Sequence, residues 1–117
     1  MKIIPDVVDN QTLHQLPPTA FAREAAKIMG TNRVSAVLVT QDERLVGIFT
    51  ERDLTARVVA VGLDPDTTTL SQVMTARPDV LAPDDSPINA LELMRLRHYR
   101  HLPVAVDGRA IGMVSIR

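Results

Sequence analysis

The sequence predicts an α+β protein built from two copies of one β-α-β-β-α unit. Three observations predict this fold class. Residues match those 65 positions later without gaps, so that Met29 meets Met94 and Gly47 meets Gly112. In each copy, a helical spacing of apolar residues precedes two short runs with strand composition. The composition, 45% hydrophobic and 23% charged over 117 residues, is that of a compact globular protein.

The first copy begins with a short strand expected near Thr12 and Leu13. The segment 19–30 then places apolar residues at helical spacing, so we expect a helix there. Thr19 is suited to cap the start of this helix, and Gly30 to end it.

Two strands and a second helix complete this copy. The segment 34–40 is β-branched and mostly apolar, which predicts a buried strand. After a turn over 41–44, a second strand is expected over 45–50. The segment 51–62 reads as a helix with an apolar stripe that includes Val61, and Gly62 as its last residue.

The second copy repeats this order. Ser86 is suited to cap a helix over 88–97, with Pro87 at its first position. Strands are expected over 101–106 and 110–115, joined by an Asp-Gly pair that is typical of tight hairpins.

Between the copies, Pro, Asp and Thr residues indicate a linker. We assign 1–62 to the first copy, 63–72 to the linker and 73–117 to the second copy, in which the final helix is cut off. Thr69 and Gln72 predict a capping box for a short helical turn. A short strand at 80–81 is expected to enter the second copy.

The corner after the strand 45–50 has the chemistry of an anion site. A helix N-terminus presents unpaired N–H groups and the positive end of the helix dipole. Thr50 can add a hydroxyl and Arg52 a charge-assisted hydrogen bond. The carboxylate of Asp53 can accept two hydrogen bonds from vicinal hydroxyls, as on a ribose. Together the three residues indicate a phosphorylated ribose.

A purely structural interpretation of this corner stays open. Thr-x-x-Asp is also a common helix start, with Thr50 as the N-cap and Asp53 as a first-turn acid favoured by the dipole. Both interpretations can hold at once.

The segment 95–103 offers a possible base-binding wall. Pro103 interrupts the backbone donors of a strand, and Tyr99 and Leu102 can sandwich an adenine. Arg100 can reach a phosphate, although a solvated surface role is equally compatible. His98 and His101 lack a third ligand nearby, so no metal site is expected.

Composition narrows the classes of function. A net charge of −1 and 3% aromatic residues argue against nucleic-acid binding. The sequence has no cysteine, which fits a reducing compartment. No stretch approaches a membrane span or a signal peptide, and we expect a cytoplasmic protein. No arrangement typical of an enzyme nucleophile stands out.

The segments 22–29, 47–54, 73–94 and 98–117 together carry a family resemblance. The chain resembles a tandem pair of CBS (cystathionine-β-synthase-type) domains over nearly its whole length. The resemblance implies two β-α-β-β-α repeats packed about a pseudo-twofold axis, with two clefts between them. It also implies a regulatory module that binds AMP, ADP, ATP, S-adenosylmethionine or NAD(H).

Site residues follow from the resemblance. Asp53 is expected to hold the ribose, and Thr50 with Arg52 the phosphate. The opposite wall of this first cleft is expected from the following residues of the second copy: Thr75, Val80, Tyr99, Arg100, Leu102 and Pro103. A second, weaker cleft would use Ser35, Ala36, Val37 and Ser115, but it lacks the counterpart of Asp53.

The expected output is a stand-alone sensor that acts on an unknown effector protein, and a homodimer also fits the family. The alternative is a ligand-free interaction or dimerisation module. The missing final helix predicts that the strand 110–115 is less covered than its counterpart, unless the natural chain continues or a partner covers it.

Overall fold

The computed structural model describes residues 1–116 and forms two units, each considered by itself. The repeat-one unit is His14–Pro78, and the repeat-two unit is Met1–Leu13 together with the chain from Asp79 onward. The N-terminal stretch, assigned from the sequence to the first copy, therefore packs with the second. Arg117, the expected counterpart of Arg52, lies outside the described residues.

The repeat-one unit has a four-stranded sheet in the order β1-β2-β3-β4. Its strands are β1 (Gln15–Leu16), β2 (Ala36–Gln41), β3 (Arg44–Thr50) and β4 (Thr75–Ala76). β1 is parallel to β2, and the other neighbours are antiparallel. The entering strand thus lies a few residues later than the predicted one near Thr12.

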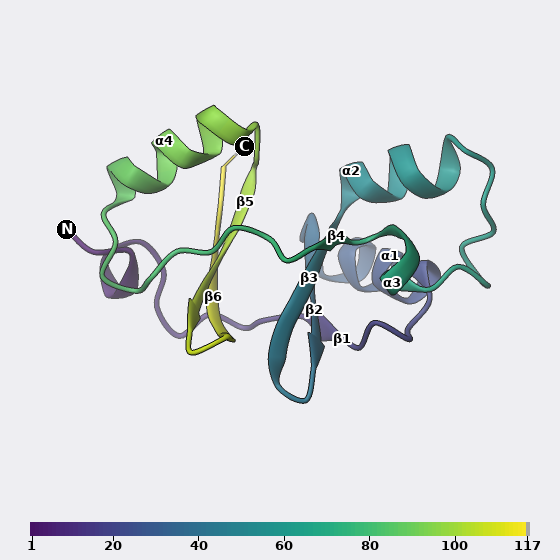
Figure 1. Ribbon diagram of the computed structural model, residues 1–117, viewed down its shortest axis with the longest axis horizontal. Coiled ribbons are helices and arrows are strands. Elements are labelled where there is room, and N and C mark those ends of the chain that lie inside the picture. Colours follow the sequence, from purple (N-terminus) through teal and green to yellow (C-terminus); the bar gives the residue numbers. More distant parts are fainter. Residues whose placement is uncertain (117) are drawn as a thin grey trace. The chain divides into compact units, whose positions relative to one another are not determined.

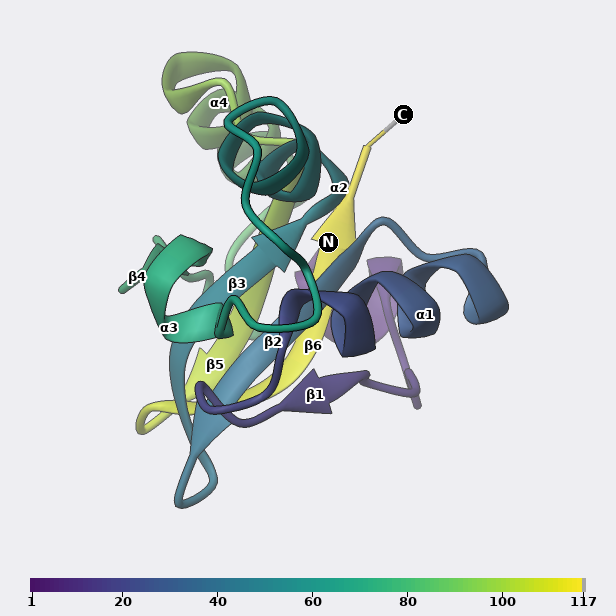
Figure 2. The same ribbon diagram turned by 90° about the vertical axis from the view of Figure 1, so that its right-hand side faces the viewer.

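The helices of this unit are α1 (Ala22–Asn32), α2 (Glu51–Asp53), η2 (Leu54–Val59, a π-helical turn) and α3 (Leu70–Val73). α2 runs directly into η2 as one coiled segment (Figure 1). α1 packs against β2, and both can be followed in Figure 2. Thr69 and Gln72 form the predicted capping box of α3, with the Thr69 N–H donating to Gln72 Oε1 at 2.8 Å.

Both predicted ends of α1 were wrong. The first N–H groups of the helix donate to the carbonyls of Thr68 and Pro65, so Thr19 has no capping role. At the other end, the helix passes through Gly30 and stops at Asn32, because Arg33 adopts a left-handed conformation with φ 55°.

The second helix also ends earlier than predicted. η2 stops at Val59, and Gly62 lies in the turn that follows, with φ 79°. Val61, predicted on the buried stripe, is 63% exposed. Only Val58 of that stripe is fully buried, because the helix ends one residue after it and Val61 lies in the turn beyond.

The repeat-two unit contains η1 (Ile3–Val7, a π-helical turn), α4 (Pro87–Arg97), β5 (His101–Val106) and β6 (Arg109–Ser115). β5 and β6 form the predicted hairpin, with a parallel bridge from Leu81 to Val104 in place of a full strand. Ser86 caps α4 by accepting from the Asn89 N–H at 3.1 Å, as predicted.

The backbones of the two units repeat each other in detail. Both hairpins carry a register shift at the same place, after Val39 and after Val104. Both main helices end on a left-handed residue, Arg33 or His98. These pairs are 65 positions apart, which confirms the internal repeat on which the predicted fold class rested.

Each unit has its own apolar core. The repeat-one core includes Ala25, Met29, Val37, Phe49 and Val58. The repeat-two core combines Leu81, Ala90, Met94, Leu102, Val104 and Val114 with Ile3 from the N-terminal stretch. Ile3 is fully buried, and its N–H donates to the Asp85 carbonyl at 2.9 Å. The N-terminal stretch is therefore part of the second fold unit.

Candidate functional site

The corner between β3 and α2 is built by a reciprocal pair of hydrogen bonds. The Asp53 N–H donates to Thr50 Oγ1 at 3.1 Å, and the Thr50 N–H donates to Asp53 Oδ2 at 3.0 Å. This is a capping box, so the structural interpretation of the corner is confirmed. It fixes the Asp53 side chain at the end of the strand rather than leaving it free in solvent.

Three groups surround the Asp53 carboxylate. Besides Thr50, the Thr75 hydroxyl lies 3.4 Å from Oδ1 and 3.5 Å from Oδ2, and Arg57 Nε lies 3.6 Å from Oδ1. Asp53 is only 8% exposed. A carboxylate has about four acceptor positions, and the two long contacts to Oδ1 leave that oxygen able to accept stronger hydrogen bonds.

The N-terminus of α2 is less open to an anion than the sequence predicts. The Glu51 N–H donates to the Ser35 carbonyl at 3.0 Å, and the Asp53 N–H is held by Thr50. Two of the first three amides are therefore satisfied within the protein. Any phosphate contact at this corner would depend on the Thr50 hydroxyl and the exposed Arg52 side chain.

Arg57 is a residue of this site that the sequence analysis missed. Its Nη1 donates to the Met74 carbonyl at 3.0 Å while its Nε faces Asp53. The i, i+4 spacing of Asp53 and Arg57 on a helix was the signal that could have identified it. Arg57 ties the helix after β3 to the end of α3, and thereby supports the carboxylate.

The predicted residues of the second cleft that lie in this unit cluster at the start of β2. Ala36 pairs with Thr50, and Val37 pairs with Phe49. Ala36 and Val37 are buried, so their side chains belong to the core and only their backbone could meet a ligand. Ser35 contributes its carbonyl to the corner.

The predicted residues of the repeat-two unit lie around the start of β5. Leu102 and Pro103 are buried, and Tyr99 packs against the same core. The Pro103 carbonyl accepts from the Leu81 N–H at 2.8 Å, so this part of the predicted irregular backbone is already used. Arg100 is exposed.

The two remaining predicted residues of this unit are solvent-facing. Val80 is 46% exposed, and Ser115 is exposed at the end of β6, where it pairs with His101. Of the predicted site residues, the structure brings Thr50, Asp53 and Thr75 together within the repeat-one unit.

The open edge of β6 is held by a side chain. Gln11 Nε2 donates to the Met113 carbonyl at 3.0 Å, and the Met113 N–H donates to Gln11 Oε1 at 2.7 Å. Met113 follows Ile48 by 65 positions, and Ile48 pairs with Thr75 of β4. The Gln11 amide therefore takes the place that a strand has in the repeat-one unit.

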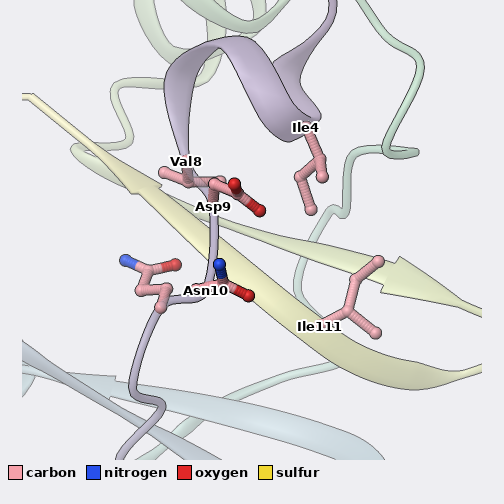
Figure 3. A pocket seen from close by; sticks show the side chains of 6 residues that line it. Ile4, Val8, Asp9, Asn10 and Ile111 are labelled. Carbon is pink, nitrogen blue, oxygen red and sulfur yellow. The ribbon is translucent and has the colours of Figure 1, made fainter.

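A shallow pocket of about 280 Å³ lies beside this contact. Figure 3 shows Ile4 and Asp9 on the N-terminal stretch and Ile111 on β6 around it. None of its lining residues belongs to the predicted site.

The histidine pair does not form a chelating face. His98 is the left-handed residue that ends α4, and His101 begins β5. Among residues 1–116, no group of three or more His, Asp, Glu or Cys side chains is arranged to hold a metal ion. In the same range, no helix has the length and apolarity that crossing a membrane requires.

The chain belongs to the CBS domain family, whose model matches residues 4–60 and 70–117. It is 40% identical over 94 residues to the Arabidopsis thaliana CBS domain-containing protein CBSCBSPB2, covering 80% of this chain and 18% of that protein. It is 39% identical to the Schizosaccharomyces pombe meiotically up-regulated gene 70 protein, covering 80% of this chain and 13% of that protein. The chain thus spans less than a fifth of the length of these two relatives.

Solved CBS structures share the fold. A protein with CBS domains from Burkholderia ambifaria is 32% identical, with a TM-score of 0.84, covering 89% of this chain and 76% of that one. A CBS domain protein from Pyrobaculum aerophilum, solved in complex with AMP, is 31% identical with a TM-score of 0.83, covering 92% and 82%. The fold class is therefore that of a CBS pair.

Proposed function

We propose that this chain is a regulatory module that binds an adenosine-containing ligand and passes that signal to a partner protein. The observation that carries the proposal is the Asp53 carboxylate, held by the Thr50 amide at 3.0 Å with Oδ1 only loosely contacted. A fixed acceptor of this kind suits the two hydroxyls of a ribose. The AMP bound by the Pyrobaculum aerophilum relative supports the same ligand class.

The proposed residue roles follow the chemistry of each group. Asp53 accepts from the ribose, and Thr50 with Arg52 contacts a phosphate. The base would be bound by the residues of the repeat-two unit proposed for the opposite wall, which are Val80, Tyr99, Arg100, Leu102 and Pro103. Thr75 would contribute from beside Asp53. The ligand class comprises AMP, ADP, ATP, S-adenosylmethionine and NAD(H), and the module acts in the cytoplasm without catalysis.

Thermal unfolding with this panel of ligands tests the proposal. A ligand present at about a hundred times its dissociation constant stabilises the folded state by about 2.7 kcal/mol. We expect at least one adenosine phosphate to raise Tm, and guanosine phosphates serve as the matched control for base recognition. No shift with any of the five ligands at millimolar concentration would overturn the proposal.

The second candidate function is a ligand-free interaction module. It is favoured by the capping box, because Thr50 and Asp53 already have structural roles. The two candidates differ in one measurable respect, since a ligand-free module associates with its partner equally well with and without adenosine phosphates. Self-association is part of both candidates.

A further inference from the structure

The pocket beside β6 is separate from every residue proposed to bind the adenosine-containing ligand. It has a volume of about 280 Å³ and lies between the N-terminal stretch and β6. Its lining residues are Ile4, Val8, Asp9, Asn10, Gln11 and Ile111. All of them belong to the repeat-two unit, so one fold unit provides the whole pocket.

The other repeat shows how this space arises. In the repeat-one unit, Met74 ends α3, and its Sδ lies 2.5 Å from the position that a Cβ on Gly47 would have. In the repeat-two unit, Val8 ends η1, and its Cγ2 lies 3.4 Å from the same position on Gly112. A valine side chain is shorter than a methionine side chain. The repeat-two unit therefore leaves room where an unbranched side chain lies in the repeat-one unit.

The walls of the pocket are apolar and held in place. Ile4 and Val8 pack against the repeat-two core. Gln11 is fixed by its two hydrogen bonds to Met113. Ile111 is 42% exposed, so its side chain is available to a ligand. Walls formed in this way can take up an aliphatic chain without rearrangement of the protein.

Asp9 is the charged residue among those that line the pocket. Figure 3 shows its carboxylate turned toward Ile4, over the space beside β6. Within residues 1–116, no basic side chain forms an ion pair with Asp9. The side-chain oxygen of Asn10 is a second acceptor at the same rim. Apolar walls beside an unpaired carboxylate suit a ligand with an aliphatic chain and a terminal ammonium group.

We propose that this pocket binds a primary aliphatic amine. The chain of the amine packs on Ile4, Val8 and Ile111. Its ammonium group pairs with the Asp9 carboxylate. A free alkylamine and a lysine side chain of a partner protein share this chemistry. The site goes beyond the proposed function, because it has no residue in common with the corner that contains Asp53.

NMR titration of the full chain with n-hexylammonium, n-hexanol and the peptide Gly-Lys-Gly tests the site. We expect saturable shifts of the Gly112 and Met113 amide signals with hexylammonium or with the peptide, and the tighter ligand identifies the source. Hexanol has the same chain without the charge and should bind at least about threefold more weakly than hexylammonium, since Asp9 is exposed. Asp9→Asn should remove this preference. Asp107→Asn, at an exposed acid of the β5–β6 turn, is the matched control and should keep it.

Filling the pocket gives a second, independent test. Val8→Met places at the end of η1 the residue type that ends α3, and it should abolish binding of the amines. Val7→Met makes the same change at an exposed neighbour that does not line the pocket, and it should bind as wild type does. Circular dichroism should show that both variants are folded.

Three results would each overturn the proposal: no shifts with either amine, equal affinity for hexanol and hexylammonium, or unchanged binding to Val8→Met. Titration of AMP into Val8→Met reads the proposed function separately, because the two sites share no residue.

Discussion

At the scale of single residues, Asp53 combines a structural and a proposed binding role. Its carboxylate and amide form the capping box with Thr50, and it also faces Thr75 and Arg57. The sequence allowed both interpretations. The structure confirms the helix cap, and it leaves one carboxylate oxygen of Asp53 able to accept hydrogen bonds from a ligand. A first-turn acid that acted on the helix dipole alone would contribute less than about 1 kcal/mol. The hydrogen bonds and the Arg57 contact of Asp53 predict a larger effect.

Replacing Asp53 by Ala should lower the free energy of unfolding by about 1–2 kcal/mol, because the capping box and the contact to Arg57 are lost together. Urea unfolding measures this. Glu51→Ala is the matched control, an exposed acid in the same turn, and should stay within about 0.5 kcal/mol of wild type. Equal effects for the two variants would contradict the structural role of Asp53.

Asp66 should make the repeat-one unit sensitive to acid. Arg23 donates two hydrogen bonds to its carboxylate, one of them from Nη2 at 3.1 Å, and this lowers the pKa of Asp66 below its ordinary value of 3.8. A lowered folded-state pKa contributes stability above the unfolded pKa, and that stability is lost as pH falls through the folded pKa.

Comparing Tm at neutral pH and below about pH 4 for wild type, Asp66→Asn and Arg23→Gln measures this contribution. On acidification, the Tm of each single variant should fall by less than the Tm of wild type. The Tm of the double variant should fall by as much as that of a single variant, because both substitutions remove the same ion pair. Both groups are exposed, so the difference should shrink at high salt. An unchanged acid response in Asp66→Asn would contradict the assignment.

At the scale of the elements, equivalent glycines of the two repeats have different surroundings. A Cβ at Gly47 would lie 2.5 Å from Met74 Sδ and 3.0 Å from the Thr75 carbonyl oxygen. A Cβ at Gly112 would meet nothing closer than Val8 Cγ2, at 3.4 Å. The difference arises because β4 pairs with β3 along the backbone, whereas Gln11 reaches β6 by its side chain.

Gly47→Ala should therefore lower the free energy of unfolding by about 1–3 kcal/mol, because the β4 backbone must move away from β3. Gly112→Ala should change it by less than about 0.5 kcal/mol. Chemical denaturation of the two variants side by side measures the contrast. Equal sensitivity at the two positions would show that the edges of β3 and β6 are covered in the same way.

Gln11→Ala should release the edge of β6. We expect faster hydrogen exchange at the Met113 amide and a loss of about 1 kcal/mol in unfolding free energy, since two backbone groups lose their partners. Thr12→Ala, at an exposed neighbour, is the control. Unchanged protection of Met113 would contradict the role of Gln11.

Most helices and strands could be predicted from the sequence, because an element assigned in one repeat was also expected 65 positions away in the other. The β5–β6 hairpin, the Ser86 cap and the Thr69 capping box were confirmed. The ends of α1 were not predictable, since Arg33 adopts its left-handed conformation against propensity and the carbonyls that satisfy the helix start come from the linker. Such distant contacts have no local signal.

The candidate site was predicted in part. Thr50 and Asp53 were identified from a local motif. Thr75 was expected on the opposite wall, from the second copy, whereas it lies in the repeat-one unit beside Asp53. Arg57 was missed although its spacing was visible, and Gln11 was missed because its partner is 102 residues away. Only the folded structure shows that four of the predicted site residues are buried, namely Ala36, Val37, Leu102 and Pro103.

At the scale of the whole molecule, the chain is a CBS pair. In each repeat, one further segment packs against the helix and the two strands that the repeats share. In the repeat-one unit this segment is the linker with α3 and β4, and in the repeat-two unit it is the N-terminal stretch with Ile3 and Gln11. This stretch covers part of β6, but β6 is still more exposed than β3, as predicted: Met113 is half-buried where Ile48 is buried. The fold is thus shared by both units, while only the repeat-one corner contains the complete Thr50–Asp53 motif within residues 1–116.

Calorimetric titration of AMP into wild type, Asp53→Asn and Glu51→Gln tests the central claim most directly. The amide of Asp53→Asn can still accept from the Thr50 N–H, so the capping box is retained while the charge and one acceptor oxygen are lost. We predict saturable binding to wild type and Glu51→Gln, and affinity at least about tenfold lower, or roughly 1.4 kcal/mol, for Asp53→Asn. Equal AMP affinity in all three proteins, or no binding to wild type, would contradict the account.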